Sequence, residues 1–286
     1  MPELPEVETI ANDLDRVLRG EVISKIELID KSKVLQTPFS QFKKKLVGAR
    51  IKKVFRRAKM LVIETNHGLI VFHLKMTGQL IYVRKNRFIA GGHPIQSTGV
   101  NVPNTFTRLV LKFTNKGSLY FNDVRKFGWV KLVQLDEFKE ISAKVGIEPL
   151  EKEFTLKFFE TMLSRRGRVH IKAVLLEQKY LSGLGNIYVD EVLFRSKIRP
   201  TRSVESLRKV DIQKLWQSIP IILRHSIKER GTTFSNFIDT SGQRGNFMKH
   251  LKVYGRGGKP CVICKKPLRK TRVVGRGSCW CEKCQK

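Results

Sequence analysis

The sequence predicts an α+β multidomain protein, with an N-terminal antiparallel β-sandwich preceded by a helix, a helical domain, and a C-terminal zinc-finger β-hairpin. Three observations predict this class. A helical apolar pattern ends near Leu18, short β-rich segments follow as far as Leu135, and helical patterns then return until five cysteines appear after residue 260. With 286 residues, the chain is long enough for two domains with cores of their own.

The first predicted element is a helix over residues 5–18. Pro5 suits the first helical position, and Glu6 and Glu8 suit the positive end of the helix dipole. Gly20 is a suitable stop signal. Apolar side chains recur on one face at helical spacing, namely Val7, Ile10, Ala11, Leu14, Val17 and Leu18.

The second region reads as a series of short strands. They are predicted at residues 23–28, 60–64, 69–74, 109–113 and 118–121. Turn residues at 66–68 and 115–117 separate neighbouring strands, and this spacing is typical of an antiparallel sandwich. Because residues 84–108 contain several glycines and prolines, we predict a long mobile loop there.

Helical patterns replace the strands after residue 136. Helices are predicted over 154–164, 169–179, 187–196 and 204–230, and Pro220 is expected to kink or split the last of them. We therefore divide the chain into a sandwich domain over 1–136, a linker over 137–152, a helical domain over 153–252 and a cysteine module over 253–286.

A glycine-containing turn at 181–188 joins two of the predicted helices. Asn186 is a good helix cap, and the glycines allow a ligand close to the backbone. Amide groups at the start of the second helix would point towards an anion such as a DNA phosphate. The alternative is an ordinary corner between two helices, with Asn186 only capping.

The charge of the chain indicates a polyanionic partner. Lysine and arginine total 56 against 25 acidic residues, which gives a net charge of +31 and a pI near 10.3. Anionic lipid is a rival partner, but the sequence contains no basic amphipathic helix or lipidation motif. Nucleic acid is therefore favoured. No apolar run approaches a membrane span and no signal peptide is visible, so we expect a cytoplasmic protein.

The cysteines predict one structural metal site. Two Cys-x2-Cys pairs, separated by 16 residues, match the spacing of a tetrahedral zinc site with Cys261, Cys264, Cys281 and Cys284 as ligands. The alternative is a reduced thiol cluster without metal. Cys279 is the extra cysteine and is expected to be a free thiol. Zinc would hold a basic hairpin that can contact phosphates.

Pro2 and Glu3 form a candidate catalytic pair. If Met1 is trimmed, Pro2 becomes an N-terminal secondary amine, and an α-amino group has a pKa of about 8. Such an amine can attack a sugar C1′ and form an iminium intermediate, and Glu3 could act beside it as a general acid or base. The alternative is that Pro2 merely follows the initiator and that Glu3 is a solvated charge.

Several segments together resemble bacterial formamidopyrimidine-DNA glycosylase, and the resemblance covers nearly the whole chain. They are PELPEVET at 2–9, RRAK at 56–59, HLKMTG at 73–78, DVRKFG at 123–128, GIEPL at 146–150, LSGLGNIY at 181–188, GTT at 231–233, VYG at 253–255 and CEKCQK at 281–286. The resemblance implies a β-sandwich, a helix-two-turn-helix domain and a zinc finger. It also implies a bifunctional base-excision enzyme that binds duplex DNA as a monomer and removes 8-oxoguanine and formamidopyrimidines.

The resemblance also assigns roles to individual residues. Pro2 and Glu3 would be catalytic, with Lys59 and Arg276 holding the flanking phosphates and assisting elimination. A wedge into the base stack would consist of Met76, Arg125 and Phe127, with Arg125 facing an unpaired cytosine. DNA-backbone contacts would come from His73, Lys126, Lys172 and Asn186, and base contacts from Thr232, Asn236 and Phe237. The alternatives are plain charges for Lys59 and Arg276 and ordinary core positions for Met76 and Phe127.

The sequence departs from the family pattern at a few positions. Lys75 stands where glycine is common, Lys126 replaces a usual arginine, Ser235 occupies a position that is often basic, and residues 105–107 lack the family's histidine. One rival function is an endonuclease VIII-type glycosylase for oxidised pyrimidines, which Leu4 and the retained wedge residues disfavour. The other is a non-enzymatic zinc-containing DNA-binding protein, which the Pro2-Glu3 pair disfavours.

Overall fold

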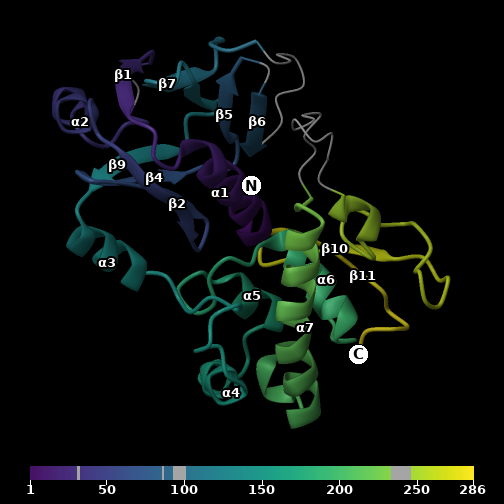
Figure 1. The fold of residues 1–286 in the computed structure, drawn as a ribbon. Helices are drawn as coiled ribbons and strands as arrows, with labels where there is room; N and C mark the ends of the chain where they lie inside the picture. Colours follow the sequence, from purple (N-terminus) through teal and green to yellow (C-terminus); the bar gives the residue numbers. More distant parts are fainter. Residues whose placement is uncertain (31–32, 86, 93–100, 233–245) are drawn as a thin grey trace. The chain divides into compact units, whose positions relative to one another are not determined.

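The computed structural model of the chain describes residues 1–286 except 31–32, 86, 93–100 and 233–245, and it divides into two compact units (Figure 1). Unit 1 comprises residues 1–142 and 229–246, and unit 2 comprises residues 143–228 and 247–286. Each unit is described by itself. The division of the chain into four parts at 136, 152 and 252 stays a prediction.

Unit 1 contains two antiparallel sheets that share one core. The five-stranded sheet has the order β1 (Ile23–Leu28), β7 (Thr107–Phe113), β8 (Ser118–Asp123), β5 (Gly78–Arg84) and β6 (Arg87–Gly92). The four-stranded sheet has the order β2 (Ile51–Arg57), β3 (Met60–Thr65), β4 (Gly68–His73) and β9 (Trp129–Val133). Buried side chains of both sheets form one cluster, which confirms the predicted sandwich. Two further helices are α2 (Phe39–Leu46) and α3 (Leu135–Ala143), and α3 occupies half of the predicted linker.

Helix α1 (Leu4–Leu18) lies where the apolar pattern predicted it. Its first turn is closed by a capping box, in which the Glu3 backbone N–H donates to Glu6 Oε2 at 2.9 Å. The helix ends at the C-cap Arg19, followed by Gly20 at φ +83°. Its apolar face is buried in the sandwich core, so the residues just ahead of it are attached to a rigid element.

The predicted loop over 84–108 is wrong at its beginning. Residues Arg87–Gly92 form strand β6, which pairs with β5 in an antiparallel hairpin. The two glycines there suggested a loop, but at Gly91 the absence of a side chain allows α1 to approach. A Cβ added at Gly91 would lie 2.1 Å from Ile10 Cγ1. Residues 93–100 lie outside the described part of the chain.

Unit 2 contains the predicted helices, with changed ends. They are α4 (Leu156–Ser164), α5 (Ile171–Leu176), α6 (Asn186–Arg195), the 3-10 helix η1 (Val204–Ser206), α7 (Lys209–Lys228) and the 3-10 helix η2 (Phe247–His250). Helix α5 stops at Leu176, earlier than predicted, because the chain turns there towards the glycine segment. Helix α7 is not split, although it contains Pro220. The hairpin β10 (Arg269–Val273) and β11 (Arg276–Trp280) follows.

Candidate active site and nucleic-acid interface

The structure buries Pro2 and Glu3 at the start of α1. Glu3 is only 3 % exposed and serves as the N-cap of the helix, whereas Met1 is 44 % exposed. With Met1 present, the nitrogen of Pro2 is an amide and has no lone pair for attack. The chemistry predicted for Pro2 therefore requires removal of Met1, and the fold supplies a rigid position for the amine that would result.

Lys59 lies in unit 1 at a tight turn between β2 and β3. Arg57 pairs with Met60, so only Ala58 and Lys59 remain in the loop, and Ala58 has φ +53°. Lys59 is 5 % exposed, so it is not an ordinary solvated charge on a strand. Its predicted part in catalysis stays a prediction.

Glu6 is a site residue whose role the sequence reading missed. Besides closing the capping box, Glu6 Oε1 accepts hydrogen bonds from the Thr232 backbone N–H at 2.8 Å and from Thr232 Oγ1 at 2.9 Å. The approach is close, because a Cβ at Gly231 would lie 2.8 Å from Glu6 Oε1. One buried carboxylate therefore joins the start of α1 to the first residues of the predicted base-contacting segment. Asn236 and Phe237, and the departure Ser235, lie outside the described residues.

The three predicted wedge residues lie on two neighbouring loops of unit 1. Met76, between β4 and β5, is 40 % exposed, and Phe127, between β8 and β9, is 52 % exposed. These values exclude the alternative that both are ordinary core residues. The Arg125 guanidinium lies 4.5 Å from the centre of the Phe127 ring, which makes a cation-π pair. Large exposed apolar side chains of this kind suit insertion between bases.

A buried carboxylate that the sequence reading missed holds these two loops together. Asp123 is 0 % exposed, and its Oδ1 accepts from the Thr77 hydroxyl and from the Arg125 backbone N–H at 3.3 Å. Its Oδ2 accepts from the Gly128 backbone N–H at 2.6 Å. Thr77 in turn accepts from the Arg125 backbone N–H at 3.1 Å. A network of buried hydrogen bonds therefore fixes the two loops that carry the exposed wedge residues.

Two lysines that depart from the family pattern have left-handed backbone conformations. Lys75 has φ +48° and Lys126 has φ +55°. This explains why glycine suits position 75, because only glycine adopts such angles without strain. The Lys126 ammonium pairs with Asp30 Oδ2 at 2.8 Å while its side chain stays 47 % exposed. Arg108 pairs with the same carboxylate oxygen.

His73 is held as a neutral hydrogen-bond donor. Its Nδ1 accepts from the Lys75 backbone N–H at 3.0 Å, so the ring proton belongs on Nε2. Burial, reinforced by the positive charges of Lys75 and Lys59, lowers the pKa of His73 to about 3. Near neutral pH the ring can therefore offer an N–H, but no charge, to a phosphate oxygen.

In unit 2, Asn186 and Lys172 do not have the positions that the sequence suggested. The N-cap of α6 is Gly185, and Asn186 is the first helical residue, whose Nδ2 donates to the Gly277 carbonyl oxygen at 2.8 Å. Lys172 is 0 % exposed and donates to Asp190 Oδ1 at 2.6 Å and to the same carbonyl at 3.1 Å. A side chain this buried does not fit the predicted contact with a DNA backbone. Both residues hold the β10–β11 hairpin, and the predicted contact of the half-buried Asn186 with the DNA backbone stays a prediction.

Two buried carboxylates on α6 complete this attachment. Asp190 Oδ2 accepts from the Cys279 backbone N–H at 3.0 Å, and burial raises the pKa of Asp190 to about 6 while Lys172 opposes the rise. Glu191 accepts from the backbone N–H groups of Lys252, Val253 and Tyr254. The sequence reading named neither residue. Their signal was two adjacent acids in the middle of an apolar helix.

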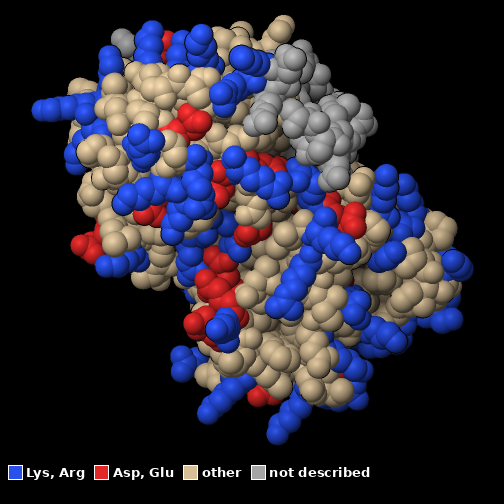
Figure 2. All heavy atoms as spheres, viewed as in Figure 1, with Lys and Arg blue, Asp and Glu red and all other residues tan. Residues whose placement is uncertain are grey.

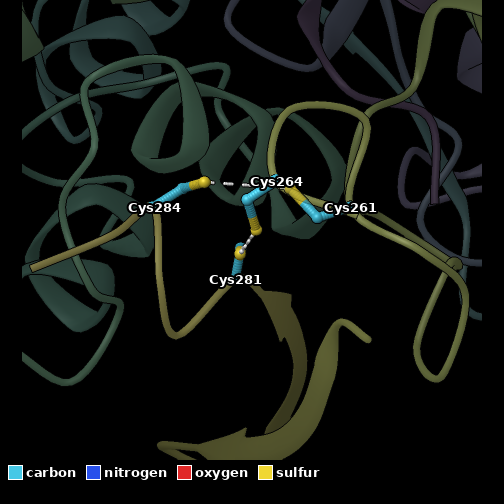
Figure 3. Close-up of side chains that lie close together, drawn as sticks. All are labelled: Cys261, Cys264, Cys281 and Cys284. Atoms are coloured by element: carbon cyan, nitrogen blue, oxygen red, sulfur yellow. Dashed lines mark hydrogen bonds between the residues drawn. The ribbon is translucent and has the colours of Figure 1, made fainter. Parts of the chain in front are cut away.

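Four cysteine side chains converge beside this hairpin (Figure 3). The sulfur atoms of Cys261, Cys264, Cys281 and Cys284 all lie within 4.8 Å of one another, close enough to hold one metal ion. Cys279 is buried outside this group. The structure brings together the four residues that the spacing selected, and four sulfur donors suit zinc in a closed tetrahedral site.

Arg276 is the first residue of β11 and is exposed in unit 2. It pairs with Val273 across a two-residue turn, in which Val274 has φ +48° and Gly275 has φ +70°. In both units, lysine and arginine side chains cover more of the face drawn in Figure 2 than acidic side chains do. None of the described helices is both long and apolar enough to cross a membrane.

Comparison with known proteins agrees with these features in both units. Residues 1–130 match the family model of the formamidopyrimidine-DNA glycosylase N-terminal domain, and residues 145–237 match that of the formamidopyrimidine-DNA glycosylase H2TH domain. Formamidopyrimidine-DNA glycosylase from Pelotomaculum thermopropionicum is 40 % identical over 290 residues, covering 100 % of this chain and 99 % of the relative. The protein of that name from Desulforamulus reducens is 38 % identical over 291 residues, which cover 100 % of this chain and 99 % of the relative.

Solved structures give the same result. A Lactococcus lactis Fpg mutant in complex with Fapy-dG-containing DNA is 34 % identical, with a TM-score of 0.87 and full coverage of both chains (100 % each). The complex of Lactococcus lactis Fpg with DNA containing an abasic site has a TM-score of 0.86, with 99 % coverage of each chain. The β-sandwich, the helix-two-turn-helix segment and the four-cysteine hairpin thus define a class of DNA-binding glycosylases. Within that class, the chain belongs to the formamidopyrimidine-DNA glycosylase family.

Proposed function

We propose that the chain is a bifunctional DNA glycosylase and AP lyase of base excision repair, which removes oxidised purines such as 8-oxoguanine and formamidopyrimidines from duplex DNA. The observation that carries the proposal is the buried Pro2-Glu3 pair at the capped start of α1. Family membership supports the glycosylase activity, and related proteins have been solved with Fapy-dG and abasic-site DNA. The enzyme is proposed to act as a monomer in the bacterial cytoplasm.

The first chemical step needs the amine of Pro2. After Met1 is removed, the lone pair of the Pro2 nitrogen attacks C1′ of the flipped nucleotide, and the bond from C1′ to the base breaks. Glu3 gives a proton to the ring oxygen O4′ as the sugar opens, which leaves an iminium between Pro2 and C1′. A free base and a covalent protein-sugar adduct result.

The iminium then drives strand cleavage. It acidifies the C2′ proton, and loss of that proton expels the 3′ phosphate by β-elimination. A second, δ-elimination expels the 5′ phosphate, and water releases the sugar fragment from Pro2. Lys59 and Arg276 are proposed to hold the two phosphates, where their positive charges stabilise the leaving groups.

The remaining residues are proposed to bind and shape the DNA. Met76 and Phe127 fill the stack where the lesion leaves it, and Arg125 donates to the unpaired cytosine. His73 contributes a neutral Nε2–H, and Lys126 a positive charge, to the backbone. Thr232, together with Asn236 and Phe237, would contact the oxidised purine.

Zinc is proposed as the only cofactor, in a structural role. Cys261, Cys264, Cys281 and Cys284 would hold it through four thiolates. No reaction step passes through it, because a closed four-ligand site leaves no position for a reactive water. Its contribution is to fix the hairpin that carries Arg276.

Borohydride trapping tests the mechanism. We expect sodium borohydride to reduce the iminium and trap a covalent complex between the processed chain and an 8-oxoguanine duplex. The matched control is the same sequence with Met1 retained, verified by mass spectrometry. It should bind the duplex with unchanged affinity and give no adduct. An equally strong adduct with Met1 retained, or none with the processed chain, would contradict the role of Pro2.

A panel of lesions tests the substrate class. Excision from matched duplexes should be faster for 8-oxoguanine and formamidopyrimidine than for oxidised pyrimidines. The reverse order would assign the chain to the endonuclease VIII-type branch. Binding without excision of any lesion would leave only a DNA-binding protein.

A further inference from the structure

A cavity of about 490 Å³ in unit 2 contains none of the residues to which the proposed function assigns a role. Its lining residues come from α4, from the segment that begins at the end of α3, and from the turn that follows α5. Its volume is within the range of roughly 300–1,000 Å³ that is usual for small-molecule sites. The cavity is therefore large enough for a ligand of the size of a nucleotide.

The lining has two chemically different sides. One side is apolar and consists mainly of Val145, Ile147, Phe158 and Met162. The other side carries the cations Arg165, Arg166 and Lys179 together with Tyr180, and no acidic residue is among the lining residues. An apolar wall opposite uncompensated positive charge suits a ligand with a flat apolar body and an anionic end.

Arg166 is held in place in the lining of this cavity. Its guanidinium carbon lies 3.5 Å from the centre of the Tyr180 ring, and its Nη1 donates to the Met162 carbonyl oxygen. These contacts fix the side chain. Its Nε is buried and has no hydrogen-bond partner among the described residues. Because that nitrogen is enclosed by the protein, the attraction of Arg166 for an anion in the cavity comes from the charge of its guanidinium group.

Tyr180 reports the positive field on the same side. The Lys179 ammonium lies 4.9 Å from the centre of its ring. Arg166, and to a smaller extent Lys179, lowers the pKa of the Tyr180 phenol. Both cations therefore lie beside one aromatic ring in the lining of the cavity, where they would also attract an anion.

The backbone around the cavity is tightly packed. The Gly146 backbone N–H donates to the Gln178 carbonyl oxygen at 2.8 Å, and Ile147 pairs with Leu181 in a short parallel bridge. A Cβ at Gly146 would lie 2.3 Å from the Tyr180 carbonyl oxygen. The two segments that line the cavity are therefore fixed against each other, which favours a site formed before the ligand arrives.

From these contacts we propose that the cavity binds a nucleoside monophosphate, with the base against Phe158 and the apolar wall and the phosphate among Arg165, Arg166 and Lys179. Bidentate guanidinium groups match phosphate oxygens, and aromatic side chains stack on bases. This binding activity is separate from base excision.

The direct test is calorimetric titration of the full, zinc-loaded chain with 2′-deoxyguanosine 5′-monophosphate at about 150 mM salt, where exposed charges are screened within ~8 Å. We expect saturable binding of one equivalent. Deoxyguanosine and inorganic phosphate, titrated separately, should each bind at least about tenfold more weakly, because each fills only one side of the cavity. Absence of saturable nucleotide binding would overturn the proposal.

Three variants locate the bound nucleotide. Arg166→Met and Lys179→Gln should each weaken nucleotide binding by roughly tenfold, the size expected for loss of a charge-assisted hydrogen bond. Arg168→Met removes the same charge from an exposed neighbour outside the lining and should change the affinity by less than about twofold. Since Lys179 is exposed, its substitution should leave folding and the borohydride adduct unchanged. Equal losses in all three variants, or none, would refute the site.

Discussion

The wedge loops of unit 1 and the finger hairpin of unit 2 both present exposed side chains towards a partner, but different forces hold them. The loops carrying Met76 and Phe127 rest on the buried carboxylate of Asp123 and join a large sandwich core. The hairpin carrying Arg276 has a small apolar cluster made largely of cysteines. A hairpin with so little core needs a metal or an attachment to a larger element. This one has four cysteines that could hold a metal ion and an attachment to α6.

The comparison shows two ways in which the protein fixes the position of exposed side chains. Backbone hydrogen bonds to one carboxylate suffice where strands on both sides fix the loop ends. Where only a two-residue turn separates two short strands, the sulfur quartet and the Lys172–Asp190 pair supply the missing restraint. The wedge loops should therefore be formed without metal, and the finger should not.

The largest expected effect is loss of the metal site. Cys281→Ser should abolish binding of one zinc equivalent and unfold the hairpin, since zinc contributes about 10–16 kcal/mol in isolated zinc-finger peptides. Elemental analysis and hydrogen exchange would measure both, and exchange in the sandwich should not change. Cys279→Ser is the matched control and should retain zinc. Loss of sandwich protection in Cys281→Ser would break the contrast between the two regions.

The next largest effect is the loss of stability when the buried ion pair between Lys172 and Asp190 is broken. Lys172→Met leaves the Asp190 carboxylate buried without its cation and should cost roughly 3–5 kcal/mol of unfolding free energy. Chemical denaturation would measure this cost. Adding Asp190→Leu should recover much of it, because neither charge of the pair then remains. If the double variant is no more stable than Lys172→Met, the pair stabilises the fold by more than offsetting the cost of burying its two charges.

Asp123→Asn tests the support of the wedge. The amide keeps the shape but replaces one acceptor oxygen with a donor, which would face the backbone N–H groups now bound. We expect a loss of about 1–3 kcal/mol and weaker excision with retained zinc. Asp136→Asn is the control, because Asp136 is 91 % exposed and should change stability little. Loss of zinc in Asp123→Asn would remove the distinction between the two regions.

The smallest effect is a pH dependence that belongs to unit 1. The pKa of His73 falls from 6.5 to about 3 on folding, so the unfolded chain binds more protons between these values. The contribution of His73 to the free energy of unfolding is fully present above pH 6.5. It is lost as the pH falls towards 3, by at most about 1.4 kcal/mol per pH unit. Comparing denaturation of the chain and His73→Gln at pH 7 and 5 checks this. An unchanged difference between the two pH values would contradict a buried neutral histidine.

Local patterns in the sequence were enough for the elements whose causes are local. The apolar period and Gly20 placed α1 within a residue, because helix formation and termination depend on neighbours in sequence. The spacing of the cysteine pairs selected the quartet for the same reason. The glycines at 91 and 92 suggested a loop wrongly, since Gly91 allows the close approach of α1 and Gly92 the close approach of the neighbouring strand at Gly78.

Hydrogen bonds between residues that are distant in sequence could not be predicted from local patterns. Glu6 looked like a charge suited to a helix dipole, yet it bonds Thr232, 226 residues away. Lys172 looked like a phosphate ligand, yet it is buried and donates to Gly277, 105 residues further on. A side chain's polarity predicts that it needs a partner, but only packing decides which one.

The sequence by itself determined the two architectures, the metal-ligand set, the strong positive charge and the family, because periodicity, spacing and composition follow from the order of residues. Only the tertiary structure decided which carboxylates hold the site. Asp123, Asp190 and Glu191 are buried by elements distant in sequence, and burial is what makes a hydrogen bond to each of them valuable. The same physical reason separates Lys172, enclosed in the interior, from Arg276, left exposed at the start of the strand that Lys172 supports.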